Sequence, residues 1–200
     1  MASISKRPEV TIRRLEIDDL SAVYRLGEEL FTSEEYPILY RTWDPYEVSG
    51  LFTSDSEYCF VAESGDRVVG FALATTFEKE GTAWKRYGYV NWIGVSPEVQ
   101  GLHVGSRLYR RLEDAFREDG VRMMIADTVV ENENAIGFFR DLGFNTSGRH
   151  VWLTKTLRKE DGREGQESPE KKTNRKKARR MAQDASASLQ SKYRIADDSA

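Results

Sequence analysis

The sequence is poor in residues that build covalent or metal cross-links. Its 200 residues include one cysteine, Cys59, and two histidines, His103 and His150. One cysteine cannot form an internal disulfide or a CxxC metal motif, and two histidines are too few for the usual structural zinc sites. We therefore expect no bound metal, and a chain suited to the reducing environment of the cytoplasm.

Long hydrophobic runs are missing as well. No stretch approaches the roughly 18 uncharged apolar residues that a membrane-spanning helix needs. The first ten residues, MASISKRPEV, contain no apolar run that would serve as a secretory signal. The composition, 39% hydrophobic and 32% charged, is typical of a globular protein in water. The sequence predicts a cytoplasmic protein that does not use a membrane.

The net charge of −3 is the sum of two segments with opposite balances. Residues 1–158 carry 19 basic and 25 acidic side chains, whereas residues 159–200 carry 11 basic and 8 acidic ones. Apolar periodicity stops after residue 158, and seven of the ten residues from Lys171 to Arg180 are basic. We expect a folded domain over 1–158 and a basic tail over 159–200 that is disordered or conditionally helical. The tail could contact phosphates of a nucleic acid or a ribosome, or simply be solvated.

Short β-rich runs alternate with amphipathic stretches up to residue 158, which is the pattern of a mixed α/β domain. About 150 residues are enough to bury one sizeable core. The predicted strands are 10–15, 58–63, 67–77, 87–95, 123–130 and 150–157, and the predicted helices are 20–30, a short one after Pro45, 106–119 and 133–143.

The most informative stretch is VNWIGVSPEVQGLHVGSRLYRRL. A buried strand is predicted to end at Val95, Pro97 blocks its continuation, and a turn with Gly101 and Gly105 leads into a helix. Glycines allow a tight turn that exposes backbone N–H groups, and the helix N-terminus adds partial positive charge. The pattern predicts a phosphate or pyrophosphate site, although a ligand-free strand-to-helix turn would need the same glycines. The spacing fits neither a Walker loop nor GxGxxG.

Two segments resemble the GNAT superfamily of N-acetyltransferases, and in particular its ribosomal-protein N-terminal acetyltransferase branch. The triplet at 93–95, followed by QGLHVGS at 100–106, is similar to the family's acyl-coenzyme A loop. The segment from Asn132 to Phe144 is similar to the family's Asn-x-x-Ala box that ends in Gly-Phe. The resemblance covers residues 9–157. It implies the acyl-CoA N-acyltransferase fold, an α/β (α+β) fold with a mixed central sheet of six to seven strands and about four helices.

The resemblance also implies acetyl-CoA as cosubstrate and indicates which residues would hold it. The pantetheine arm would pair with backbone groups of Ile93, Gly94 and Val95. The remaining cofactor-binding candidates are Gln100, Gly101, Leu102, His103, Val104, Gly105, Ser106, Asn132 and Phe139. Asn132 suits a helix N-cap equally well. His103 stands where the family keeps a glycine, which predicts either a displaced loop or a histidine that faces a phosphate.

Transfer to an amine calls for a base, because lysine amines and α-amines have solution pKa values near 10.4 and 8 and are mostly protonated at neutral pH. The branch keeps a glutamate five residues before the asparagine, and Asp127 occupies that position. We predict that Asp127 is the general base and that burial raises its pKa. A structural hydrogen bond or an exposed strand end is the alternative. Glu131 and Tyr89 are the other candidates, and Phe139 replaces the tyrosine that the branch uses as proton donor.

The resemblance implies an acceptor site beside the cofactor, shaped largely by the first helices and their connection, which is rich in acids and aromatics in this sequence. We single out Glu34, Tyr36 and Tyr89 as substrate-binding candidates, because carboxylates attract cations and aromatic rings hold ammonium groups. A solvated helix end and a packed core would use the same residue types. Cys59, in an early strand, is interpreted as a core residue and not an acyl carrier.

The predicted function is therefore acetyl transfer to a primary amine by direct attack in a ternary complex. The acceptor is expected to be a protein or peptide amine, either an N-terminal α-amine or a lysine. A polyamine-like small amine and a non-catalytic acyl-CoA-binding sensor are the alternatives, and a homodimer is compatible with the sequence.

Overall fold

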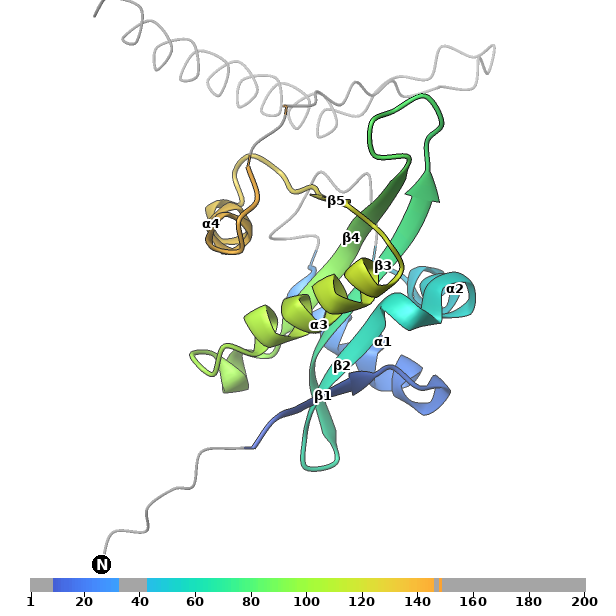
Figure 1. The fold of residues 1–200 in the computed structure, drawn as a ribbon. Helices are drawn as coiled ribbons and strands as arrows, with labels where there is room; N and C mark the ends of the chain where they lie inside the picture. The colour runs from blue at the N-terminus through green and yellow to red at the C-terminus, as the bar shows by residue number, and fades with distance from the viewer. Residues whose placement is uncertain (1–8, 33–42, 146–147, 149–200) are drawn as a thin grey trace, which may run out of the picture. The chain divides into compact units, whose positions relative to one another are not determined.

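The computed structural model describes residues 9–32, 43–145 and 148. Within them, one sheet has its five strands in chain order, with antiparallel neighbours from β1 to β4 and with β5 parallel to β4 (Figure 1). The strands are β1 (Thr11–Arg14), β2 (Cys59–Ser64), β3 (Arg67–Glu78), β4 (Arg86–Val95) and β5 (Met123–Ala126). The chain divides into two units, Met1–Ser147 and Gly148–Ala200, and all described elements belong to the first.

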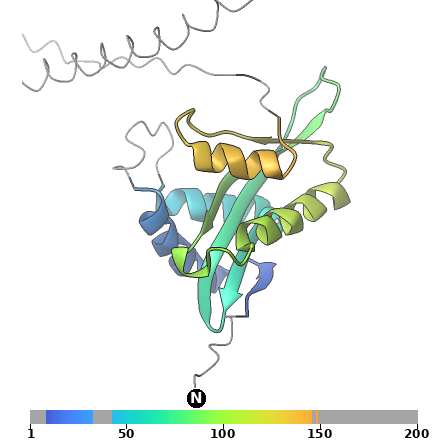
Figure 2. The same cartoon turned by 90° about the vertical axis from the view of Figure 1, so that its left-hand side faces the viewer.

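Four helices cover the two faces of this sheet. They are α1 (Leu20–Leu30), α2 (Pro45–Asp55), α3 (Val104–Glu118) and α4 (Glu133–Asp141). Short 3-10 turns are η1 (Ile17–Asp19), η2 (Ser56–Tyr58) and η3 (Pro97–Val99). Helices α1 and α2 lie over one face, while α3 lies over the other with α4 beside it (Figures 1 and 2). Within the described residues, no helix is both long and apolar enough to cross a bilayer.

The core consists of two apolar layers that share the central strands. On the α3 side, Leu108, Leu112 and Phe116 pack with residues such as Phe60, and all four are buried. On the α1 and α2 side, a second cluster contains Val23, Val48, Val61 and Phe71. Alternate residues of β2 therefore enter opposite clusters, which explains why the strand reads as an uninterrupted apolar run.

An ion-pair network fixes the start of α1 to the edge of the sheet. The Arg13 guanidinium donates to both carboxylate oxygens of Asp19, at 2.6 and 2.9 Å, and to Glu63 at 3.0 Å. Asp19 also accepts the backbone N–H of Glu16 at 2.8 Å. The hydrogen bonds from Arg13 lower the pKa of the Asp19 carboxyl below its ordinary value. This charged network ties β1, β2 and η1 together.

The predicted elements within the described residues are confirmed, with two differences in the sheet. The described residues contain five strands, fewer than the six to seven expected, and the predicted strand 150–157 lies outside them. The strand predicted over 123–130 is half as long, because β5 ends at Ala126. Beyond that residue the chain leaves the sheet toward α4, so the apolar residues that suggested a longer strand belong to a connection (Figure 1).

Candidate functional site

The pairing of strands β4 and β5 ends about halfway along β4. Their parallel pairing begins at Tyr87 with Met123 and ends at Val90 with Ala126, whereas β4 continues to Val95. At the same level the β3–β4 register shifts, so that Asn91 is an extra residue in β4. An extra residue bends its strand and increases the local twist. We use the term fork for the place where residues 91–95 of β4 diverge from the chain that begins at Asp127.

Two of the predicted catalytic candidates meet at the fork. Tyr89 is opposite Ile125, and Asp127 follows two residues later, so both side chains belong to the same face of the sheet. The Tyr89 hydroxyl donates a hydrogen bond to Oδ1 of Asp127. Asp127 is exposed directly after β5, so the prediction that it is buried is wrong. Asp127 instead agrees with the alternative interpretation, because it is exposed at the end of the strand and accepts a hydrogen bond. Glu131 lies further on, in the turn before α4.

The glycine-containing loop leads into α3 as predicted. The Ser96 side chain accepts the backbone N–H of Glu98, and η3 follows the strand. Gly101 has φ +79° and His103 has φ 56°, so both residues have left-handed backbones. His103 therefore adopts a conformation that favours glycine, at a strain of about 1–2 kcal/mol. Its side chain is exposed at the first turn of α3, where backbone N–H groups lack helical acceptors. Such a turn is suited to bind an anion.

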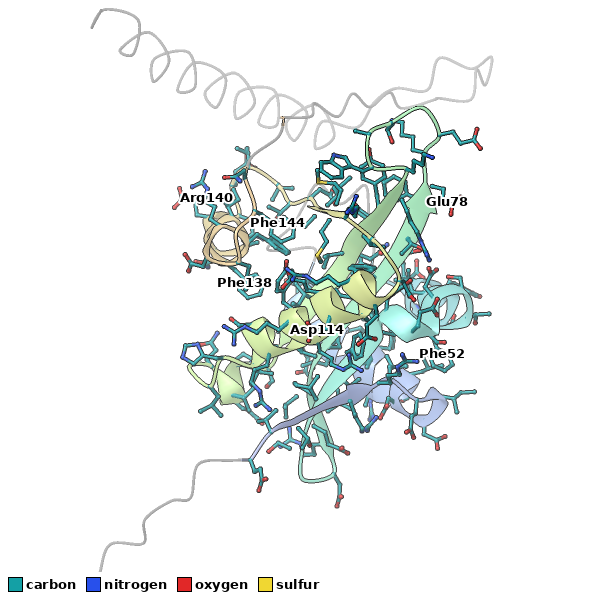
Figure 3. The ribbon with its side chains drawn as sticks, in the orientation of Figure 1. Phe52, Glu78, Asp114, Phe138, Arg140 and Phe144 are labelled. Carbon is teal, nitrogen blue, oxygen red and sulfur yellow. The ribbon has the colours of Figure 1, made fainter. Side chains whose placement is uncertain are left out.

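Gly105, in the first turn of α3, allows α3, α4 and β4 to pack closely together. A Cβ atom at Gly105 would lie 3.3 Å from the Phe138 ring and 3.6 Å from Cγ2 of Val95. The absence of a side chain therefore lets α4 and β4 approach the start of α3. Figure 3 shows Phe138 on the side of α4 that faces α3, and Arg140 on its outer side.

Phe139 lies in an aromatic cluster. Its ring centroid is 5.3 Å from that of Phe138 and 5.1 Å from that of Phe144, which in turn contacts Tyr109. Phe139 also packs against the core on the α3 side. At the start of the same helix, the Asn132 side chain accepts the backbone N–H of Ala135 at 3.0 Å. Asn132 is thus an N-cap, and its contact with a cofactor stays a prediction.

On the opposite face, aromatic side chains cover the part of β4 that borders the fork. The Trp92 ring lies 4.9 Å from Phe31 and 5.2 Å from Trp43. Trp43 is buried, in agreement with the interpretation that aromatics of this connection pack the core. The Trp92 indole donates to Oε2 of Glu47 at 3.0 Å. Glu34 and Tyr36, which were predicted to bind substrate, lie outside the described residues.

Sequence reasoning did not single out Glu47 or Trp92. The only sequence signal for Glu47 is the helix start at Asp44-Pro45, where Asp44 accepts the backbone N–H groups of Tyr46 and Glu47. This capping pattern places Glu47 in the first turn of α2. It does not reveal the contact with β4, which depends on how α2 packs on the sheet.

Cys59 is inaccessible, with 0% of its surface exposed. Burial raises the pKa of its thiol to about 12. Its interpretation as a core residue is confirmed. No group of three or more potential metal-ligating side chains occurs in the described part of the chain.

The segment that contains the fork and the loop before α3 also matches a known family. The model of the acetyltransferase (GNAT) family matches residues 20–144. The chain belongs to the GNAT family. Among its relatives, N-alpha-acetyltransferase RimI of Mycobacterium tuberculosis is 31% identical over 145 residues, which cover 70% of this chain and 80% of that protein.

A second GNAT relative is N-alpha-acetyltransferase 30 of Schizosaccharomyces pombe, 28% identical over 88 residues. This match covers 44% of the chain, and the chain spans only 57% of that relative. A solved aminoglycoside N-acetyltransferase in complex with CoA has a similar fold, with a TM-score of 0.61 at 19% identity, over 77% of this chain and 99% of that structure.

Proposed function

We propose that this GNAT protein transfers the acetyl group of acetyl-CoA to a primary amine of a protein or peptide, either an N-terminal α-amine or a lysine. The observation that carries the proposal is the fork, where Tyr89 donates a hydrogen bond to Asp127 and from which β4 leads toward the turn before α3. Strand β4 thus passes the Asp127 carboxylate at its last pairs with β5 and then leads to a turn suited to an anion. Names of two relatives, both N-alpha-acetyltransferases, support a protein acceptor.

The residues present fit acetyl-CoA. Left-handed backbones at Gly101 and His103 and the first turn of α3 provide N–H donors suited to a pyrophosphate. Strand β4 continues past β5 through Ile93, Gly94 and Val95, whose backbone groups would pair with the pantetheine arm. Bound there, acetyl-CoA supplies the acetyl group and a thiol leaving group.

Asp127 would act on the acceptor amine. An ammonium group must lose a proton before its nitrogen can attack, and the Asp127 carboxylate accepts that proton directly or through one water molecule. The Tyr89 hydroxyl holds the carboxylate by the hydrogen bond across the β4–β5 pair. Since Asp127 is exposed, solvent can carry the proton away from it. Tyr89 is therefore a positioning residue for the base.

No hydroxyl is available at Phe139 to protonate the departing sulfur. A thiol with a pKa near 8.5 leaves adequately as a thiolate when a positive helix end stabilises it, so transfer does not require an acid at this position. The direct route is also favoured by Cys59, which is too deeply buried to carry an acetyl group.

A non-catalytic acyl-CoA-binding sensor is the second candidate, and His103 in the loop and the missing hydroxyl at Phe139 favour it. A small-amine acceptor is the third, supported by the similarity in fold to an aminoglycoside N-acetyltransferase. We further propose that residues 1–158 form the catalytic domain in the cytoplasm. Residues 159–200 then form a tail open to a nucleic-acid or ribosome contact, and a homodimer is compatible with this arrangement.

The test is thiol release from acetyl-CoA with α-amine peptides, lysine peptides with blocked N-termini, and small amines. Mass spectrometry then identifies the acetylated nitrogen. Amine-dependent thiol release with an acetylated peptide supports the proposal. Tight CoA binding without turnover on any amine would instead support the sensor.

A further inference from the structure

The face of the fork opposite α3 is covered by the end of α1 and the start of α2. A Cβ atom at Gly94 would lie 2.8 Å from Cδ1 of Leu30, the last residue of α1. From the start of α2, Glu47 reaches Trp92 on the same strand. Both contacts involve the part of β4 beyond its last pair with β5, on the face opposite α3. An acceptor that reaches the fork from this face therefore passes the first turn of α2.

Glu47 is a half-buried carboxylate held against this part of β4. Its Oε2 accepts the Trp92 indole N–H at 3.0 Å, and Trp92 is only 8% exposed. Because Trp92 is packed against Phe31 and Trp43, it is a rigid donor that limits the positions of the carboxylate. A carboxylate can accept about four hydrogen bonds, so one indole leaves capacity for a ligand.

The negative charge of Glu47 is not needed for this packing. An indole N–H is satisfied by any neutral acceptor, including a glutamine amide oxygen. None of the ion pairs between described residues includes Glu47, in contrast to Glu63 and Glu113, which pair with Arg13 and Arg117. A partly desolvated carboxylate attracts a cation more strongly than one in bulk water, because the local dielectric is lower.

We propose that Glu47, oriented by Trp92, binds a positive charge on the acceptor next to the amine that is acetylated. This inference rests on the proposed acetyl transfer, and it narrows the acceptor to molecules with a cationic group beside the reacting amine. In a peptide, that group is a basic side chain within the first residues after the α-amine. Glu47 is thus a specificity-determining residue, with a role separate from that of Asp127.

The experiment uses α-amine peptides that carry arginine or citrulline at the second or third residue. Citrulline has nearly the shape of arginine without its charge. We expect the full-length protein to have a KM roughly tenfold lower for the arginine peptide at one of these positions, as for a partly shielded charge pair. Glu47→Gln keeps an acceptor for the indole and should raise the KM of the arginine peptide about tenfold, with kcat and the citrulline peptide little changed.

Glu113→Gln is the matched control, because it removes the same charge from α3 on the other face of the sheet. It should preserve the preference for arginine. Trp92→Phe removes the donor that orients Glu47 and should reduce the preference in part. If Glu47→Gln retains the full preference, or if the wild-type chain shows none at either position, the inference is wrong.

Calorimetric binding of the same peptides to the CoA-saturated protein separates this inference from the proposed function. Binding that favours arginine through Glu47, without acetyl transfer, would support the subsite and contradict the catalytic proposal. Acetyl transfer without a Glu47-dependent difference in binding or KM would support the catalytic proposal and contradict the subsite. Unchanged CoA affinity in each variant shows that the fold is retained.

Discussion

The Tyr89 hydroxyl donates a hydrogen bond to the Asp127 carboxylate across the last pairs of β4 and β5. These two residues are 38 positions apart in the sequence, and they meet where the two strands separate. The contact gives the exposed Asp127 side chain a defined orientation at the fork. It also makes the contributions of the two residues separable by mutation.

Asp127→Asn should lower kcat for amine acetylation about 10²- to 10³-fold, because a general base typically contributes 10²- to 10⁴-fold. Tyr89→Phe should lower it only about tenfold, since the carboxylate remains but loses its orienting donor. Steady-state kinetics with acetyl-CoA and a peptide amine measure both effects. Both variants should bind CoA with wild-type affinity. A normal rate and pH–rate profile in Asp127→Asn would remove this residue as the base.

His103→Gly should stabilise the protein, because glycine adopts the left-handed backbone without the strain of a side chain. After allowance for the greater entropy of glycine in the unfolded chain, the gain in unfolding free energy should be about 0.5–1 kcal/mol. Thermal and urea unfolding measure it.

Gly101→Ala is the matched comparison, because it introduces a side chain at φ +79° in the same loop and should destabilise the fold. The His103→Ala variant tests whether the His103 side chain faces a phosphate of the cofactor. A weaker CoA affinity in His103→Ala would mean that the imidazole contacts the cofactor. A lower stability of His103→Gly would contradict the strain at this position.

Acid should weaken the fold in part through Asp19. Arg13 lowers the pKa of this carboxyl in the folded state below its value in the unfolded chain. Its stabilising contribution is therefore complete above the unfolded pKa of about 3.9, and it is lost as the pH falls through that value toward the folded pKa. Asp19→Asn should cost about 1–3 kcal/mol at neutral pH and less at acidic pH.

Urea unfolding between pH 7 and pH 3 tests this pH dependence. Asp66→Asn, in the exposed turn between β2 and β3, should retain the wild-type profile. Parallel curves for Asp19→Asn and the wild type over the whole range would show that Asp19 contributes no pH-dependent stability.

Cys59→Ala should leave kcat within about twofold, because direct attack needs no thiol on the enzyme. A pKa of about 12 and complete burial should also make the native thiol react with alkylating reagents only after unfolding. Thiol labelling with and without denaturant checks the second point. An acetyl adduct on Cys59 found by mass spectrometry during turnover would contradict the ternary-complex mechanism.

The sequence predicts the elements well where local signals are strong. The turn at Gly65-Asp66 and the proline after β4 mark strand ends, and the apolar spacing of Leu108, Leu112 and Phe116 marks the buried face of α3. It overestimates β5, because an apolar run alone does not reveal that the neighbouring strand bends away at Asn91. The burial predicted for Asp127 failed for the same reason.

The residues of the candidate site likewise divide into those that the sequence predicts and those that it does not. Positions such as the turn residues Gly101 and His103 and the N-cap Asn132 could be found in the sequence, because turns and helix starts depend on local backbone geometry. The contact between Glu47 and Trp92 could not, since it joins residues 45 positions apart through the packing of α2 on the sheet.

A crystal structure of the full-length protein with CoA and an α-amine peptide is the most direct test of the fork as the site of acetyl transfer. The proposed mechanism predicts a thiol sulfur in the fork and a peptide α-amine within direct or single-water reach of Asp127. It also predicts a pyrophosphate at residues 101–106. A pantetheine arm that lies outside the fork, or an α-amine beyond the reach of Asp127, would contradict it.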